Sequence, residues 1–145
     1  METKEILTKL RGKHNFSQDE MAEKLFVTRQ AVSRWENGET VPGTDTLKII
    51  SKTFGVSINY LLGQPLNTTC QVCGSPLDDN CYSCESDGTV NDKYCKWCYI
   101  DGFHKYSSMD EVINDVVPRW KWGTREQMSD WLRSKLVTLE YWQNK

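Results

Sequence analysis

The sequence predicts a mainly α-helical protein in two parts: a five-helix N-terminal domain, and a small domain of short β-hairpins that ends in two helices. Three observations lead to this prediction. The first 64 residues carry apolar side chains at helical spacing between capping residues. From residue 65 cysteine, glycine, asparagine and aspartate dominate, a composition that suits turns and small hairpins. After residue 107 the helical pattern returns.

Length and charge limit the possible functions. The 145 residues suffice for one ordinary domain or two small ones, and the net charge is −2. Residues 1–64 hold nine Lys/Arg against eight Asp/Glu, and residues 65–145 hold nine against twelve. The long-range field is therefore weak, so any binding to nucleic acid must come from locally placed cations and helix N-termini.

Targeting segments are not evident in the sequence. No apolar run approaches the roughly 20 residues that a membrane-spanning helix needs. The N-terminus opens directly into an amphipathic pattern, without the charged-then-apolar order of a signal segment. We therefore expect a cytoplasmic protein without membrane contact.

Three helices are predicted before residue 38. Apolar residues at helical spacing indicate the first of them within residues 1–13. Ser17 and Glu20 form a capping box that begins the second helix. Thr28 caps the third, after a turn at residues 26–27. The side chains expected to face the core are Ile6, Leu7, Leu10, Met21, Ala22, Leu25, Ala31, Val32 and Trp35.

Two further helices complete the N-terminal domain. The fourth is expected to begin near Thr44 and to end at Gly55, with Leu47, Ile50 and Phe54 buried. Ser57 caps a short fifth helix over residues 58–62, which Gly63 and Pro65 bring to an end. We place the domain at residues 1–64 and a linker at residues 65–69.

The third helix has a polar face. If Ala31, Val32 and Trp35 point inward, the opposite side presents hydroxyl, guanidinium and carboxamide groups. Arginine offers a fork that matches guanine O6/N7, and glutamine does the same for adenine N6/N7, at roughly 1–3 kcal/mol of discrimination each. A solvated surface is the simpler explanation for any one of these residues. The outward residues are Thr28, Arg29, Gln30, Ser33 and Arg34.

Residues 6–63 resemble the lambda-repressor-like (XRE, Cro-type) helix-turn-helix family. The resemblance lies in Ser17-Gln18, Thr28 to Ser33, Trp35 to Gly38 and Tyr60 to Gly63. It implies binding to double-stranded DNA, with the five outward residues of the third helix at base edges. It also implies phosphate contacts from Gln18 and Asn37, and an ion pair between Arg11 and Glu36.

The second part contains three Cys-x-x-Cys pairs, at positions 70/73, 81/84 and 95/98. In a cytoplasmic protein such pairs are more often metal ligands than disulfides. Two of them facing each other form a tetrahedral four-thiolate zinc site. The most suitable pairs are Cys70 with Cys73 and Cys95 with Cys98, which 21 intervening residues separate. We expect Zn²⁺ at these four residues.

The middle pair, Cys81 and Cys84, leaves the ligand assignment open. It could replace one of the other pairs, contribute to a shared or second metal site with His104, or stay free as a dithiol. We rank these readings after the site formed by the outer four cysteines. A redox-active pair ranks last, because no strand-helix-strand pattern surrounds it.

The sequence after Thr69 resembles a bacterial zinc-ribbon family. The similar segments are Cys70 to Leu77, Asp87-Gly88, and Tyr94 to Phe103, followed by two helices. The resemblance implies a zinc-ribbon domain over residues 70–145, and it does not require the middle cysteine pair. Four thiolates leave no open coordination position, which favours a structural metal over a catalytic one. Sensing of oxidant or zinc through the surplus thiols is a minority hypothesis.

Two capping boxes predict the C-terminal helices. Ser108 and Glu111 begin a helix that Pro118 stops, and Thr124 and Gln127 begin the last one. Its apolar stripe is most simply core packing, although the outer residues could also supply a dimer surface. The stripe consists of Met128, Trp131, Leu132, Leu136, Leu139 and Trp142.

Together these features predict a sequence-specific transcription regulator, a repressor that binds a pseudo-palindromic operator as a homodimer. The alternative is an autoregulating antitoxin whose C-terminal zinc module binds a protein partner. An enzyme ranks far behind, because we find no nucleophile–base constellation, open metal site or glycine-rich phosphate loop in the sequence.

Overall fold

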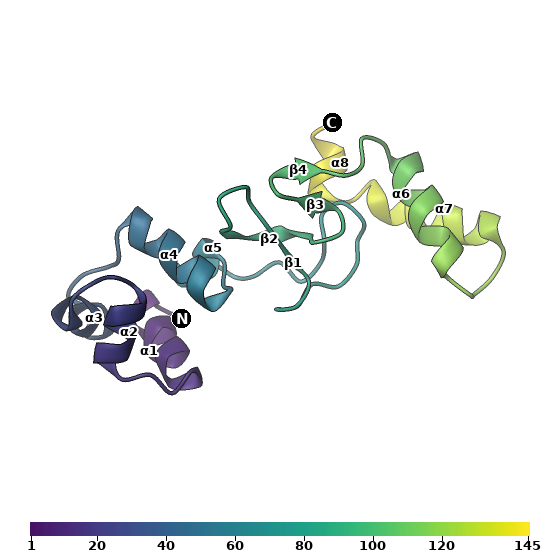
Figure 1. The fold of residues 1–145 in the computed structure, drawn as a ribbon. Coiled ribbons are helices and arrows are strands. Elements are labelled where there is room, and N and C mark those ends of the chain that lie inside the picture. Colours follow the sequence, from purple (N-terminus) through teal and green to yellow (C-terminus); the bar gives the residue numbers. More distant parts are fainter. The chain divides into compact units, whose positions relative to one another are not determined.

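The computed structural model describes residues 1–145 as two compact units. The first unit comprises Met1–Leu66 with Asp87–Val90, and the second comprises Asn67–Ser86 with Asn91–Lys145. Each unit has a core of its own. Figure 1 follows the chain through both. The helices of the first unit are α1 (Thr3–Lys13), α2 (Gln18–Lys24), α3 (Arg29–Glu36), α4 (Thr44–Phe54) and α5 (Ile58–Leu61).

All five predicted N-terminal helices are present, and their ends follow local chemistry. Ser17 and Glu20 form the predicted capping box at the start of α2. The Thr28 side chain caps α3 by accepting a hydrogen bond from the Ala31 N–H at 3.2 Å. Gly55 ends α4 with a positive φ of 66°, a conformation that glycine adopts without strain.

Packing of α1, α2 and α3 against one another supports the face proposed to read DNA. Met21 and Leu25 of the second helical segment are fully buried, and so is Val32 on α3. Each helix therefore turns its apolar stripe inward, as the spacing predicts. The buried core consists of Ile6, Leu7, Leu10, Met21, Ala22, Leu25, Val32, Trp35, Leu47, Ile50 and Leu61.

The second unit contains two small antiparallel hairpins, as the composition predicts. β1 pairs with β2, and β3 pairs with β4 so that Tyr99 lies opposite His104. Cys84 and Cys95 are the last residues of β1 and β2, and the other four cysteines lie in the turns and in the loop before the strands. The strands are β1 (Tyr82–Cys84), β2 (Val90–Cys95), β3 (Tyr99–Ile100) and β4 (Phe103–His104).

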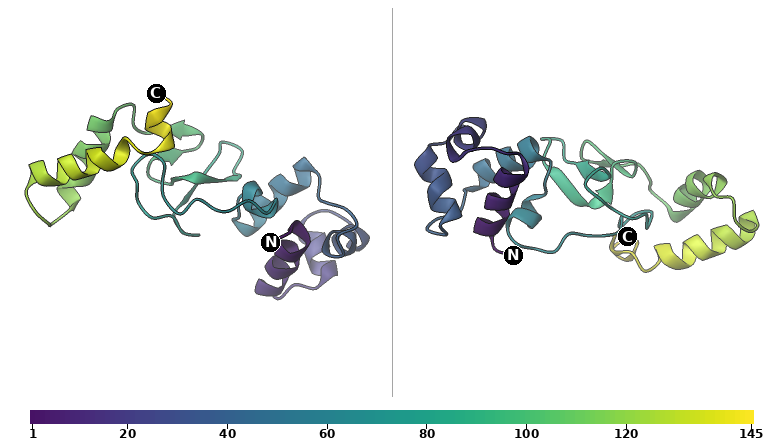
Figure 2. Two further views of the ribbon diagram at one scale, coloured as in Figure 1. Left: turned by 180° about the vertical axis from the view of Figure 1, so that it is seen from behind. Right: turned by 90° about the horizontal axis from the view of Figure 1, so that it is seen from below.

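The C-terminal helices differ in detail from the prediction. α6 ends at Val116 as predicted, and Pro118 lies inside the 3₁₀ turn η1 that follows it. The predicted last helix is two helices, α7 and α8, which Figure 2 shows as separate segments. The elements are α6 (Met109–Val116), η1 (Val117–Arg119), α7 (Arg125–Leu136) and α8 (Glu140–Gln143).

A local hydrogen bond and a distant anchor accompany the break after α7. The β-branched pair Val137 and Thr138 follows the helix, and the Thr138 hydroxyl donates to the Lys135 carbonyl at 2.7 Å. Trp142 then anchors α8, because its indole N–H donates to the Val72 carbonyl at 2.7 Å in the loop between two cysteines. Trp131, which we expected in the apolar stripe, is 47% exposed.

One predicted capping box is only half formed. Ser108 caps α6 by accepting from the Glu111 N–H, but the Glu111 carboxylate binds Ser107 instead of closing the box. The box at Thr124 and Gln127 is complete. None of the helices combines the length and apolar character that crossing a bilayer requires.

Candidate nucleic-acid interface and metal centre

The predicted DNA-reading face of α3 points to solvent. Arg29, Gln30 and Arg34 are exposed, whereas Val32 and Trp35 on the opposite side are buried. None of the residues predicted to contact bases or phosphates is buried in the core. Of the full set, Thr28, Arg29, Gln30, Arg34 and Asn37 are exposed, and Gln18 and Ser33 are half-buried.

Most of these side chains surround one open hollow of about 460 Å³. The hollow lies between the start of α2 and the outer face of α3. Thr28 and Asn37 do not line it. The exposed carboxylate of Glu39 lines it too, a residue that the sequence analysis did not single out. Glu39 follows the helix without any motif that marks it. The remaining lining residues are Gln18, Arg29, Gln30, Ser33 and Arg34.

The ion pair implied by the family resemblance is present and holds Gln18. Arg11 donates to both carboxylate oxygens of Glu36, at 2.6 and 3.1 Å, and also to the Phe16 carbonyl at 3.0 Å. The Gln18 amide donates to the same carboxylate at 2.9 Å. This network ties the ends of α1 and α3 to the start of α2. It orients Gln18 toward the hollow, a link that no sequence motif indicated.

Electrostatics of this network predict how it responds to acid. Burial alone would raise the pKa of Glu36, but the hydrogen bonds from Arg11 and Gln18 outweigh it, and the pKa lies below its ordinary value of 4.5. The hydrogen bond that Arg11 donates to Glu36 likewise raises the pKa of Arg11. The stabilisation is therefore complete above about pH 4.5 and is lost as the pH falls below that value.

Replacing Glu36 tests this network. Glu36→Gln is expected to lower the free energy of unfolding of the first unit by about 1 to 2 kcal/mol, because Arg11 loses its carboxylate. The variant should also lose less stability than wild type between pH 5 and about pH 3, as followed by thermal unfolding. Glu39→Gln, at an exposed carboxylate, is the matched control. Equal acid sensitivity of wild type and Glu36→Gln would contradict the assignment.

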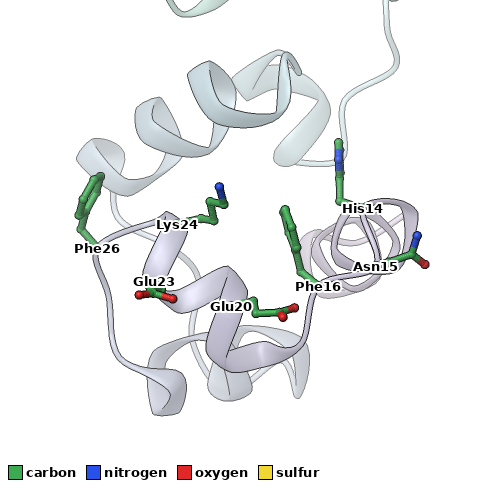
Figure 3. A pocket seen from close by; sticks show the side chains of 7 residues that line it. All are labelled: His14, Asn15, Phe16, Glu20, Glu23, Lys24 and Phe26. Atoms are coloured by element: carbon green, nitrogen blue, oxygen red, sulfur yellow. The ribbon is translucent and has the colours of Figure 1, made fainter.

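The turn between α2 and α3 presents an aromatic side chain. Phe26 has a φ of 57°, and its side chain is 86% exposed. It lines a surface hollow of about 530 Å³ at the opposite end from His14 (Figure 3). The Lys24 ammonium lies 5.8 Å from the Phe16 ring in the same hollow. The left-handed conformation costs a residue with a Cβ roughly 1–2 kcal/mol, whereas glycine adopts it freely.

We therefore expect Phe26→Gly to stabilise the first unit by about 1 kcal/mol. The substitution removes the backbone strain, and almost no buried surface is lost because the Phe26 ring is exposed. Phe26→Ala is the matched control, because it removes the ring but keeps the strained Cβ. Chemical denaturation of both variants measures the difference. A Phe26→Gly variant no more stable than Phe26→Ala would show that the turn is unstrained.

Four of the six cysteines come together in the second unit. The Sγ atoms of Cys70, Cys73, Cys95 and Cys98 all lie within 4.8 Å of one another, and all four residues are buried. The Sγ atoms of Cys73 and Cys95 are 3.9 Å apart. A tetrahedral site with Zn–S bonds of about 2.3 Å has edges of about 3.8 Å. The thiols thus fit a four-coordinate metal ion.

Backbone turns aim these thiols inward. The Gly74 N–H donates to the Cys70 carbonyl at 2.9 Å, and Gly74 has a φ of 76°. The Cys98 N–H donates to the Cys95 carbonyl at 3.0 Å. The Cys95 N–H also points at the Cys70 sulfur, 3.2 Å away, which stabilises negative charge on that atom.

The four thiols differ in how readily they lose a proton, because they are hydrogen-bonded to one another. Hydrogen bonds from Cys73, Cys95 and Cys98 lower the pKa of Cys70, because they stabilise a thiolate there. The same bonds to Cys70 and Cys73 raise the pKa values of Cys95 and Cys98. Without a cation Cys95 and Cys98 therefore keep their protons, and a divalent ion would allow all four sulfurs to be thiolates.

Cys81 and Cys84 lie outside this group. Cys81 is half-buried and Cys84 is exposed at the end of β1. Both are free cysteines in the structure, so no disulfide joins them. Asp78 raises the pKa of the Cys81 thiol through a hydrogen bond, which disfavours a reactive thiolate.

His104, the other possible ligand, is engaged elsewhere. Its ring lies among those of Tyr94, Tyr99 and Tyr141, with centroid distances of 4.6, 4.8 and 4.2 Å. Burial lowers the pKa of His104, since the charged form is less well solvated there. His104 is thus part of an aromatic cluster on β4, and it is not among the residues that gather as possible metal ligands.

Comparison with known families agrees with both parts of this description. A family profile described as "Helix-turn-helix" matches residues 7–61. A second profile, described as "Putative zinc ribbon domain", matches residues 69–143, more than half of the chain. The chain belongs to this zinc-ribbon family. It carries an XRE-type helix-turn-helix domain ahead of the ribbon.

Several curated proteins named as helix-turn-helix regulators are similar to part of this chain. The "HTH-type transcriptional activator BcrR" of Enterococcus faecalis is 46% identical over 69 residues, 47% of this chain and 34% of that protein. "HTH-type transcriptional regulator ImmR" of Bacillus subtilis is 40% identical over 58 residues, 40% of this chain and 46% of that protein. The prophage-derived regulator YonR of the same species is also 40% identical, over 54% of its length.

The chain thus covers between about a third and about half of the length of these relatives. No solved structure matches it. The helix-turn-helix profile and the zinc-ribbon profile match consecutive parts of the chain, and the second includes all six cysteines.

Proposed function

We propose that the chain is a sequence-specific repressor that binds a pseudo-palindromic operator as a homodimer in the cytoplasm. One observation carries this proposal: the guanidinium and carboxamide groups of α3 are exposed around an open hollow, while the apolar side of the same helix is buried. The exposed groups are those that recognise base edges in the major groove. The names of the relatives, one an activator and one a regulator of transcription, support DNA binding and a role in transcription, and the repressor role is our own proposal.

Each residue of this face has a role in the proposal. Arg29 and Arg34 read guanine, and Gln30 reads adenine. Arg29 is only 3.8 Å from Asp19 in an exposed pair, a weak interaction that leaves it free to reach DNA. Thr28 and Ser33 contact neighbouring base edges.

Phosphate contacts supply the affinity that does not depend on sequence. Gln18 lies at the N-terminus of α2, where free backbone N–H groups favour an anion, and Glu36 holds its amide in place. Asn37, at the C-terminal end of α3, is the second phosphate clamp. Because these contacts release counterions, affinity should fall steeply with salt concentration.

A dimer follows from the geometry of DNA. A single α3 reads only a few base pairs, and two copies can read major grooves that face the same side about 34 Å apart. A dimer on a promoter excludes the polymerase by occupying its site, and we therefore propose repression.

The metal in this proposal is Zn²⁺, held by Cys70, Cys73, Cys95 and Cys98. Four sulfur ligands suit zinc and complete its coordination, so the ion would stabilise the hairpins rather than take part in a reaction. Cys81 and Cys84 are not needed for it.

Selection of bound duplexes from random sequence, with zinc measured on the same sample, tests the proposal. The expected consensus has two inverted half-sites with centres one helical turn apart, and one zinc ion per chain. A reporter with this consensus inside its promoter should then be repressed. Recovery of duplexes without a common sequence would contradict sequence-specific binding, and increased expression would contradict repression.

A further inference from the structure

A carboxylate without an ion-pair partner lies on the face of the first unit that is proposed to enter DNA. Glu39 is exposed and lines the hollow of about 460 Å³ together with the base-reading side chains of α3. It forms no ion pair within the chain, although the guanidinium groups of Arg29 and Arg34 line the same hollow. A surface proposed to bind a polyanion therefore carries a negative charge that no ion pair neutralises.

The C-terminal end of α3 holds the backbone of Glu39 in a fixed place. Gly38 has a φ of 78°, and its N–H donates to the Trp35 carbonyl at 3.1 Å. The Glu39 N–H donates to the Arg34 carbonyl at 2.9 Å. These two bonds form the Schellman motif, in which the backbone turns back over the last turn of the helix. The Glu39 carboxylate therefore starts from an ordered position and approaches DNA together with α3.

Hydrogen-bonding chemistry limits what this carboxylate can contact on a duplex. An ionised carboxylate only accepts hydrogen bonds, and the negatively charged phosphates repel it. The donors that the major groove presents are the N4 amino group of cytosine and the N6 amino group of adenine. Adenine places its N7 acceptor next to the amino group, whereas cytosine presents no acceptor in this groove. Cytosine is therefore the base edge that suits Glu39 best.

We propose that Glu39 is a specificity-determining residue of the DNA-binding face, which accepts a hydrogen bond from the N4 amino group of a cytosine in the operator. Where that cytosine is missing, the carboxylate meets no such donor and the phosphates repel it, so it weakens binding to other sequences. The inference rests on the proposed function and assigns the same face a third kind of base contact. The other two are guanine by Arg29 and Arg34, and adenine by Gln30.

Titration of the zinc-loaded full chain against its selected operator and the single-base variants of that operator tests the contact. Wild type should prefer a C·G pair over the other pairs at one position by about 5- to 150-fold. Glu39→Ala should lose this preference, and at low salt it should bind unrelated duplexes about fivefold more tightly than wild type does, because a repulsion is removed. Glu39→Gln should prefer adenine to cytosine at the same position, since a carboxamide matches adenine N6/N7.

Glu23→Ala is the matched control for the loss of charge. It also removes an exposed carboxylate from the first unit, but Glu23 lines the other hollow, which Phe26 shares. The control should keep the base preference of wild type at every position of the operator. Thermal unfolding and zinc content should equal those of wild type in all three variants, because neither Glu23 nor Glu39 belongs to the core.

The outcomes separate this inference from the proposed function. If both Glu39 variants bind every duplex more tightly by one common factor, Glu39 only repels phosphates and the base contact is wrong. If both bind every duplex as wild type does, Glu39 stays in solvent and the inference is equally wrong. Either result leaves sequence-specific binding through α3 intact. A wild type that prefers no sequence would instead overturn the proposed function, and the cytosine contact with it.

Discussion

Removal of the metal is expected to unfold the hairpins of the second unit and to leave the helix-turn-helix folded. Structural zinc contributes on the order of 10–16 kcal/mol in small domains, which exceeds or matches the whole stability of such a domain. The effect should be this large because the four ligands, Cys70, Cys73, Cys95 and Cys98, belong to the buried core themselves. Nuclear magnetic resonance of the full chain, before and after a chelator, reports both units at once.

Single cysteine replacements sharpen this prediction. Cys70→Ser should abolish stoichiometric zinc binding and remove the dispersed signals of β1–β4, whereas Cys84→Ser, at an exposed thiol, should keep both. Cobalt substitution of the wild type should give the absorption of a tetrahedral thiolate site. Retention of one tightly bound ion in Cys70→Ser, or its loss in Cys84→Ser, would contradict the ligand assignment.

Removal of a base-reading side chain is expected to change specificity, with a cost of about 1–3 kcal/mol at one position of the site. Arg29→Ala should bind the preferred operator about 5- to 150-fold more weakly and should no longer distinguish the base that Arg29 contacts. Because α3 caps and core residues are untouched, the thermal stability of the variant should equal that of wild type. Titration against a set of single-base operator variants measures the change.

Gln18→Ala provides the contrast within the same hollow. It removes a phosphate contact, so it should weaken binding to every duplex of the set by a similar factor. Equal losses across all sequences for Arg29→Ala would contradict its role in base reading. A sequence-dependent loss for Gln18→Ala would contradict its role at the phosphate.

Local patterns were enough to predict most of the fold. Capping residues such as Ser17 and Thr28 act within one helical turn, so the starts of the N-terminal helices could be read directly from the sequence. The break after α7 could not, because it depends on Trp142 reaching the Val72 carbonyl, 70 positions away in sequence. The exposure of Trp131 was missed for the same reason, since helical spacing cannot say where the core ends.

The candidate sites, too, could be predicted only in part from the sequence. Spacing within each Cys-x-x-Cys pair left three choices of two pairs, and only the tertiary fold brings Cys70 and Cys73 to Cys95 and Cys98. The exposure of Arg29 follows from the period of α3, whereas the Gln18 bond to Glu36 joins separate helices and had no sequence signal. Glu39 was missed because it follows the helix as an ordinary polar residue.

The account depends most on the outer face of α3 entering duplex DNA. A titration of the zinc-loaded full chain with its selected operator, followed by nuclear magnetic resonance, tests this directly. The signals to follow are those of the Arg29, Gln30 and Arg34 side chains. We predict that these signals and the backbone amides near them shift in step with binding, and that a duplex of unrelated sequence produces much smaller shifts at the same residues. Tight operator binding that leaves these three side chains unshifted would contradict the account.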